Sequence, residues 1–273
     1  ISPGDSVRTH TGGVQPVRNL QVKHYEGPLY HLRAGEVMRV TGEHPLWVAS
    51  SEMRDGAVQI SEPSWKNAAD VREGIDYLCI PKKTYTTKAN EPQTLYISDI
   101  LDEGTYRIKG DLIAPKGNAG KYISNKIDVT PDVAFVLGLF VSEGNTTDSA
   151  VYFTFSASET GYVDCVRDFA KKIGVHCRQY AAKKSTANVC LHSSILASVF
   201  SKLCGSKAVE KRVPDAILAS NDDVQRAFLS GVFAGDGSVP EFRTGSATAT
   251  ITTVSPVAIE QIRAMLLGQD VYS

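Results

Sequence analysis

The sequence predicts two domains of different class: a β-rich domain over residues 1–128, followed by an α+β domain over residues 129–273 with two α-β-β-α repeats. Its 273 residues are roughly 1.8 times the length of a typical domain. Short alternating apolar runs give way to helical apolar spacing after Pro131. Within the second domain, a similar segment occurs twice, which predicts a pseudo-twofold fold.

Composition excludes several classes of protein. Hydrophobic residues make up 42% and charged residues 22%, so disorder and a bare coiled coil are excluded. The five cysteines include no CxxC pair, which argues against a disulfide framework and a zinc site. Because no stretch approaches the roughly 20 apolar residues of a membrane span, we expect no membrane partner and an intracellular location, cytoplasmic or nucleoid-associated.

The β-rich domain contains short runs bounded by Gly, Pro and Asp, which are typical of strands and turns. Examples are VQPVRNLQV, PLYHLRAGEVMRVTG and DYLCIPKK. In the second domain, apolar residues recur at helical spacing over 133–140, 163–173 and 195–203, and Gly174 and Gly205 follow the last two. We place the domain boundary in the Gly, Lys and Asn-rich segment near residues 115–130.

Net charge is −1, from 29 basic and 30 acidic residues, but charge is unevenly distributed. Residues 1–128 hold 16 of each sign, whereas residues 167–212 hold 10 basic and 2 acidic side chains, a local charge of +8. This segment predicts a surface for a polyanion.

The repeat consists of PDVAFVLGLFVSEG, ending at Gly144, and DVQRAFLSGVFAGDG, ending at Gly237. A β-branched stretch and an amphipathic helix, starting near Tyr162 or Pro256, follow each copy. From the motif glycine to the glycine that ends this helix, the spacing is 30 residues in the first copy and 31 in the second. Matched spacing predicts two copies of one structural unit.

Each copy carries small residues four positions apart, then an acid and a glycine: Gly138, Ser142, Glu143 and Gly144, and Gly231, Gly235, Asp236 and Gly237. Small residues at i and i+4 share a helix face and allow two backbones to approach closely. Packing through these faces would bring the two carboxylates together at the helix C-termini, where a Mg²⁺ ion would offset their repulsion. The alternative is that each acid is a solvated residue before a capping glycine.

These motifs resemble the LAGLIDADG homing endonucleases, whose nine-residue signature aligns with residues 136–144 and 229–237. The resemblance implies a saddle of antiparallel strands over double-stranded DNA, with Glu143 and Asp236 as catalytic metal ligands for Mg²⁺. Glu143 replaces the commoner Asp and keeps the carboxylate. The K-x-[IV]-P element ahead of the second motif matches Lys211 to Pro214, and Lys211 would stabilise charge on the scissile phosphate; otherwise it is a surface lysine.

Candidate DNA contacts lie in a segment that reads as a β-hairpin, HCRQYAAKKSTANVCLH. They are Arg178, Lys183 and Lys184, with Arg243 in the corresponding region of the second copy. Arginine can read guanine in the major groove and lysine can hold phosphates. Each is also compatible with an ordinary surface charge.

The amino-terminal domain resembles the splicing domain of the Hedgehog/intein horseshoe fold in ISPGDSVRTHTGGVQPV, VTGEHPLWV and WKNAADVREGIDYLCIPK. Its T-x-x-H pattern is Thr41 and His44. The resemblance implies that His44 strains or protonates the scissile amide while Thr41 holds it, which promotes an N-to-S acyl shift without a cofactor. A structural histidine is the alternative reading of His44.

Two departures bear on splicing. Position 1 is Ile1 and not a Cys, Ser or Thr, so the family's junction cysteine is expected just before Ile1, and no His-Asn dipeptide occurs. The first repeat runs 93 residues, from Val136 to Phe228, and the second 45, from Leu229 to Ser273. We therefore expect the amino-terminal portion of an intein, with host exteins and a missing carboxy-terminal intein segment as partners.

The leading hypothesis is protein self-splicing combined with site-specific, metal-dependent cleavage of double-stranded DNA. One alternative is a DNA-binding module derived from such an enzyme without nuclease activity; retention of both motif acids argues against it. The other is Hedgehog-like autoprocessing without ligation.

Overall fold

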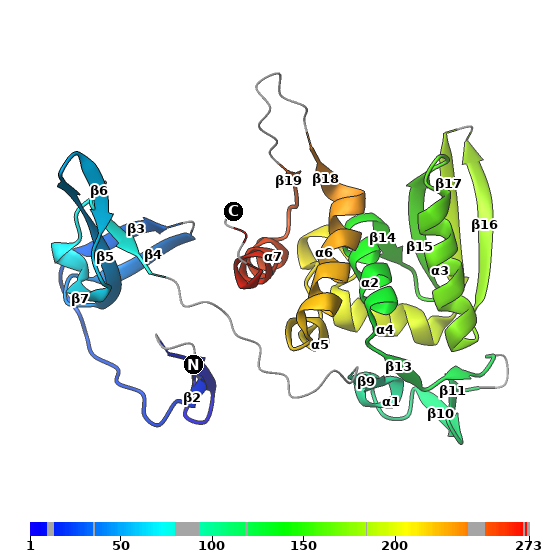
Figure 1. Ribbon diagram of the computed structural model, residues 1–273. Coiled ribbons are helices and arrows are strands. Elements are labelled where there is room, and N and C mark those ends of the chain that lie inside the picture. The colour runs from blue at the N-terminus through cyan, green and yellow to red at the C-terminus, as the bar shows by residue number, and fades with distance from the viewer. Residues whose placement is uncertain are drawn as a thin grey trace. The chain divides into compact units, whose positions relative to one another are not determined.

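The computed structural model describes residues 1–9, 14–34, 36–79, 93–117, 120–183, 185–239, 249–269 and 271. Lys184 and Arg243, two of the expected DNA contacts, lie outside these residues. The chain forms two compact units, residues 1–84 and 85–272 (Figure 1). The boundary expected near residue 128 therefore falls inside the second unit.

The first unit consists of short antiparallel strands and one 3-10 turn. They are β1 (Ser6–Arg8), β2 (Val14–Pro16), β3 (Leu29–Ala34), β4 (Glu36–Thr41), β5 (Pro45–Arg54), β6 (Ala57–Ile60), β7 (Ser64–Asn67), η1 (Ala68–Asp70) and β8 (Asp76–Leu78). β1 pairs with β2, β3 with β4, and the long strand β5 with β6, β7 and β8. The expected β-rich character is confirmed.

The apolar core of the first unit is small. Its buried members are Leu46, Val48 and Ala68. Several large apolar side chains of this unit are exposed instead, among them Val22 (94%), Met53 (68%), Val58 (63%) and Ile60 (58%).

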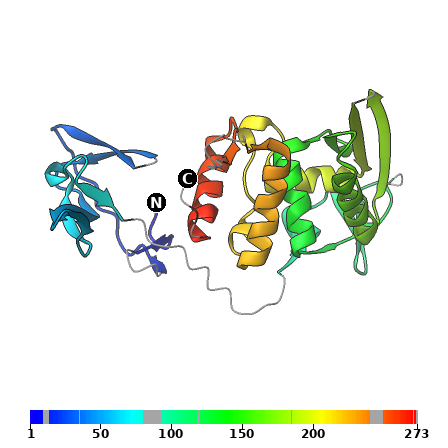
Figure 2. The same ribbon diagram turned by 45° about the horizontal axis from the view of Figure 1, so that its top comes forward.

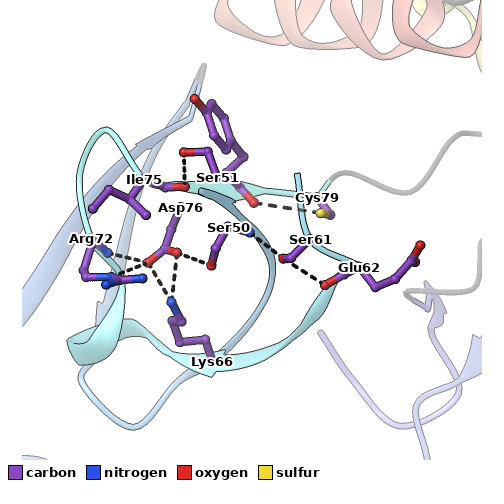
Figure 3. Close-up of polar contacts among 10 residues, drawn as sticks. Ser50, Ser51, Ser61, Glu62, Lys66, Arg72, Ile75, Asp76 and Cys79 are labelled. Carbon is purple, nitrogen blue, oxygen red and sulfur yellow. Dashed lines mark hydrogen bonds and ion pairs between the residues drawn. The ribbon is translucent and has the colours of Figure 1, made fainter. Parts of the chain in front are cut away.

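A polar network around Asp76 ties β8 to β5 and β7 (Figure 3). The Asp76 side chain is fully buried, and its carboxylate accepts hydrogen bonds from Lys66 Nζ at 2.8 Å, Ser50 Oγ at 2.5 Å and the Arg72 amide at 2.7 Å. Burial alone would raise the pKa of Asp76, but these hydrogen bonds outweigh burial and lower the pKa to about 2. The network therefore holds a charged carboxylate inside the unit.

The second unit begins with a small β module: β9 (Thr94–Tyr96), α1 (Ile97–Ile100), β10 (Tyr106–Lys109), β11 (Leu112–Pro115), β12 (Ile123–Ser124) and β13 (Lys126–Asp128). Ile97, Ile113, Ile123 and Ile127 are buried in the same core as the helices that follow. This shared core places the module in the second unit, which strand-like local spacing could not reveal.

A four-stranded antiparallel sheet and its helices form the first repeat. They are α2 (Pro131–Glu143), β14 (Gly144–Thr146), β15 (Ala150–Ser156), α3 (Thr160–Ile173), β16 (His176–Lys183), β17 (Thr186–His192) and α4 (Ser194–Cys204). The strand order is β14-β15-β17-β16. Val151, Phe153 and Phe155 alternate into the core. The expected hairpin and three helices are confirmed.

η2 (Ala208–Glu210) and α5 (Asp215–Leu218) lead into the second repeat. The second repeat consists of α6 (Asp222–Asp236), β18 (Gly237–Ser238), β19 (Thr250–Ile251) and α7 (Pro256–Gly268). Side-chain oxygens of Thr130, Asn221 and Ser255 cap α2, α6 and α7. The motif helices α2 and α6 lie side by side in both views (Figures 1 and 2). Among the described helices, none is long and apolar enough to cross a membrane.

Candidate functional site

The two motif helices cross through their glycines. A methyl group on Gly138 would lie 2.2 Å from the carbonyl oxygen of Phe228, and one on Gly231 would lie 2.2 Å from the carbonyl oxygen of Phe135. Further along, a methyl group on Gly235 would lie 2.2 Å from Ser142 Oγ. The backbones are thus in direct contact, and the expected packing through small residues is confirmed.

Both motif glycines connect a helix directly to a strand. Gly144 (φ −100°, ψ 150°) and Gly237 (φ −84°, ψ 145°) have extended backbone, not the left-handed conformation of an ordinary capping glycine. Each needs to be glycine because of space: a methyl group would lie 2.2 Å from Phe140 Cδ2 at Gly144 and 2.3 Å from the Phe233 carbonyl oxygen at Gly237. The motif acids therefore stand where helix becomes strand.

Glu143 and Asp236 are brought to the same end of the crossing. The Cγ atom of Glu143 lies 2.7 Å from where a methyl group on Gly235 would be, next to Asp236 in sequence. Partial burial raises the pKa of Glu143, and the nearby charge of Asp236 raises it further. Partial desolvation also raises the pKa of Asp236, which Lys211 partly offsets. The two carboxylates repel each other and are partly desolvated, so a cation is favoured there.

Lys211 is buried behind these acids, with 5% of its surface exposed. Its Nζ donates to the carbonyl oxygens of Phe140 at 2.7 Å and Gly144 at 2.8 Å, and lies 3.6 Å from the centroid of the Phe140 ring. Burial lowers the pKa of Lys211 to about 8, and Cys204 and Asp236 oppose this shift only in part. The surface-lysine alternative is wrong, because the ammonium group fills the carbonyl end of α2.

The backbone at Lys211 and Val213 is held by side chains from the second repeat. Ser255 Oγ donates to the Lys211 carbonyl oxygen at 2.6 Å and accepts from the Ala258 amide at 3.1 Å. Gln261 Oε1 accepts from the Val213 amide at 2.8 Å. A single buried hydroxyl thus caps α7 and anchors the lysine.

The donor chemistry of this site fits a divalent cation. Carboxylate oxygens of Glu143 and Asp236 are ligands that Mg²⁺ prefers, and Mg²⁺ keeps several waters when few protein ligands are present. The carbonyl oxygens of Phe140 and Gly144 already accept from Lys211. Within the described residues, no group of three or more His, Cys, Asp or Glu side chains is arranged to hold a metal. Among the residues that the structure describes, Glu143 and Asp236 would then be the acidic side chains on the ion.

The local charge of +8 is not one continuous surface. Lys172 pairs with Asp132 at 2.8 Å, Lys202 pairs with Asp102 at 2.6 Å, and Lys211 is buried. Arg167 and Lys207 also pair with carboxylates. Because those carboxylates lie partly outside the segment, a charge sum over sequence overstated the free positive surface.

Arg178 lies on the exposed face of the four-stranded sheet. Its guanidinium stacks 4.8 Å from the centroid of the Tyr180 ring in the same strand. Lys183 ends β16 at the hairpin turn, where the register shifts. Of the four expected DNA contacts, Arg178 is therefore the one whose side-chain geometry can be described.

In the first unit, Thr41 and His44 form a tight turn after β4. The His44 amide donates to the Thr41 carbonyl oxygen at 3.0 Å, and the Ala68 amide donates to the His44 carbonyl oxygen at 2.9 Å. His44 is exposed, and Ile1 is 83% exposed. Within the described residues, no hydrogen bond joins His44 to β1 or β2.

Sequence reasoning missed the residues that position Lys211. The Ser-Pro pair at residues 255 and 256 is a recognisable helix start, so the cap of α7 could have been predicted. Its second bond, to Lys211 44 residues away, has no local signal.

Comparison with known proteins places the second copy in a class. Residues 223–273, from α6 to the end of α7 and beyond, match the family model of a LAGLIDADG-like domain. The carboxy-terminal portion of this chain is thus LAGLIDADG-like. A match to the crystal structure of I-DmoI in complex with DNA and Mn covers 51% of this chain and 77% of that chain, with 14% identity and a TM-score of 0.38.

Curated relatives are large proteins with different names. The chain is 27% identical over 190 residues to DNA-directed RNA polymerase subunit Rpo1C of Methanocaldococcus jannaschii, which covers 68% of this chain and 21% of the relative. It is 25% identical over 208 residues to the alpha subunit of ribonucleoside-diphosphate reductase NrdEB of Bacillus subtilis; this match covers 70% of this chain and 18% of the relative. A DNA polymerase of Thermococcus hydrothermalis is 30% identical to this chain over 117 residues, and this match covers 41% of this chain and 7% of the polymerase. The chain spans about a fifth of the length of the first two relatives.

Proposed function

We propose that the second unit is a site-specific, metal-dependent endonuclease of double-stranded DNA, and that the first unit belongs to an intein-type splicing domain. The observation that carries the endonuclease proposal is the crossing of α2 and α6, which brings Glu143, Asp236 and the buried Lys211 to one place. Two carboxylates that repel each other beside one ammonium group suit the hydrolysis of a phosphodiester.

Each group has a role that its surroundings favour. Glu143 and Asp236 would hold the divalent cation, which when bound polarises the phosphoryl oxygen and lowers the pKa of an attacking water. Lys211 keeps the carbonyl oxygens of Phe140 and Gly144 occupied and supplies positive charge near the phosphate. The exposed face of the four-stranded sheet, with Arg178 on it, would lie against DNA.

The relatives support an inserted element. A DNA polymerase, a reductase and a component of RNA polymerase carry out different reactions, yet each matches this chain over only about a fifth of its own length or less. A shared segment of this size is explained by an element common to them, not by their own chemistry. The host exteins would then be the sequences on either side of such an element.

The endonuclease is tested with a plasmid that carries the uninterrupted host gene, formed by joining the coding sequences on either side of this element. The protein should cut it with Mg²⁺ or Mn²⁺ and not with a chelator. Glu143→Gln and Asp236→Asn should each lower the cutting rate at least a hundredfold. Glu103 is an exposed acid outside both motifs, and Glu103→Gln should cut at the parent's rate.

Equal cutting by the parent and by the variant that carries both Glu143→Gln and Asp236→Asn would overturn the assignment. Tight, sequence-specific binding by the parent without cutting in any divalent metal would instead establish the DNA-binding module without nuclease activity.

The splicing proposal rests on the turn that presents Thr41 and His44. Its backbone is pinned by the Ala68 amide, which leaves the exposed imidazole available to a scissile amide. The uncovered apolar side chains of the first unit support further chain packing against it, as a carboxy-terminal intein segment would. Splicing would need no cofactor.

A cysteine placed before Ile1, with a short extein ahead of it, tests this half. Added thiol should cleave the junction in the parent, and His44→Ala should slow that cleavage at least tenfold. His31→Ala, an exposed histidine of β3, is the matched control. Cleavage that does not depend on His44 would refute the assignment, and cleavage without ligation when the carboxy-terminal segment is supplied would favour Hedgehog-like autoprocessing.

A further inference from the structure

A cavity of about 330 Å³ lies at the end of the four-stranded sheet, where the β9–β13 module meets it. Its polar lining comes from four places in the sequence: Lys121 before β12, Ser149 before β15, the imidazoles of His176 and His192, and Ser193 and Ser194 at the start of α4. The cavity is therefore assembled by tertiary structure and not by one motif.

Every ionisable side chain of this lining is basic. Lys121, His176 and His192 are present, and no carboxylate is among the described lining residues. The two imidazole rings are nearly parallel, with centroids 6.1 Å apart and an interplanar angle of 25°. The amino end of α4 adds a partial positive charge. The composition of the cavity favours an anion with several acceptor oxygens.

His192 is oriented from its far side. Its Nε2 lies 3.3 Å from Tyr180 Oη, and its Nδ1 lies 3.7 Å from Cys190 Sγ. These contacts hold the ring at the edge of the sheet without placing a negative charge on it. The position of the imidazole is therefore determined before any ligand arrives.

The cavity continues the exposed face of the sheet. His176 pairs with His192 across the strands, and Arg178 pairs with Cys190, two residues along each strand. Because side chains alternate between faces, all four lie on the same face as Tyr180. The cavity and Arg178 thus belong to one surface, and the β9–β13 module extends that surface through Lys121.

We propose that this cavity, named here the phosphate pocket, binds one backbone phosphate of duplex DNA at the flank of the cleaved site. The proposal rests on the proposed endonuclease function. The Lys121 ammonium, the imidazole N–H of His176 and the serine hydroxyl groups are donors to phosphate oxygens, whereas both ring nitrogens of His192 already contact Tyr180 and Cys190. Such phosphate contacts set the register of a protein on DNA without reading its sequence. The β9–β13 module would thereby add a fixed anchor to the DNA surface of the sheet.

The first arm of the test measures binding of the whole chain to fluorescent target duplex, without divalent metal, over a series of salt concentrations. Lys121→Ala should weaken binding roughly five- to tenfold and reduce the steepness of the log affinity against log salt plot by about 0.9, as expected for one lost phosphate contact. His176→Ala, which removes the imidazole donor of the pocket, should weaken binding in the same direction. Lys109→Ala, an exposed lysine of β10 outside the pocket, should leave both quantities unchanged.

The second arm follows the imidazole resonances of His176 and His192 by NMR during titration with inorganic phosphate. Saturable shifts in the parent that disappear in Lys121→Ala support an anion site in this cavity. If the parent nevertheless fails to bind the duplex, the endonuclease and DNA as the source of the phosphate are both overturned, and the anion site alone is retained. Shifts with phosphate but an unchanged salt slope in Lys121→Ala would overturn DNA as the source of the phosphate. No shifts and no change of slope would overturn the proposal entirely.

Discussion

Replacing Gly231 with alanine tests whether backbone contact between α2 and α6 builds the site. The new methyl group would lie 2.2 Å from the Phe135 carbonyl oxygen, 2.9 Å from the Leu139 amide nitrogen and 3.1 Å from Gly138 Cα. All three are backbone atoms, so no side chain can turn away. Because a relaxed carbon to oxygen contact is roughly 3.3 Å, the helices must separate by about 1 Å.

Overpacking of this kind costs about 1–3 kcal/mol. An alanine in an open helical position should instead stabilise by up to about 1 kcal/mol. Gly161, in α3, is the matched control, because nothing lies within 4 Å of a methyl group there. Gly231→Ala should therefore be less stable than Gly161→Ala by about 1–4 kcal/mol, which for a unit of this size separates their Tm values by roughly 2–16 °C.

Calorimetry or urea unfolding followed by circular dichroism measures this difference. The rate of DNA cutting provides a second readout, since a 1 Å displacement of catalytic groups costs on the order of a hundredfold. Equal stability of Gly231→Ala and Gly161→Ala would refute the reasoning, because it would show that the helices do not touch at their glycines.

Three further predictions concern single side chains. Asp76 has a folded-state pKa of about 2, below its ordinary value, so the first unit should keep its full stability above about pH 4 and lose stability as the pH falls through about 2; thermal melts should show this loss in the parent and not in Asp76→Asn. Burial lowers the pKa of Lys211 in the folded chain to about 8, so between about pH 8 and 10.5 the unfolded chain binds more protons than the folded chain. The stability of the second unit should therefore rise with pH over that range. Urea unfolding of Lys211→Met should lack this rise. Ser255→Ala removes the cap of α7 and the anchor of Lys211, and should cost about 1–2 kcal/mol and lower kcat more than it raises KM, whereas Ser255→Thr should retain most of both.

Much of the second unit could be predicted because its signals are local or repeated. The spacing of Gly138 and Gly231 relative to the motif acids predicted a close helix crossing, and that crossing is present. Helical periodicity predicted α3 and α4 to within a residue or two of their observed ends. The roles of the site residues stay predictions.

Other features depended on contacts between distant segments. The β9–β13 module looks like a piece of the β-rich half until Ile97, Ile113 and their neighbours are seen in the helical core. The K-x-[IV]-P element predicted Lys211 near the motif acids, but no local signal predicted its burial against α2, 71 residues away from its acceptor Phe140. A charge count carries no information about which charges are paired or buried.

The sequence by itself determined the two classes of domain, the repeat and the pair of acids at its helix ends, because periodicity and small-residue spacing act within one helix or strand. Only the tertiary structure decided where the units divide, how Ser255 holds Lys211, and that Lys121 meets His176 and His192 in one cavity. Those outcomes depend on burial and on hydrogen bonds between segments far apart in the chain, and these arise only once the core has closed around them.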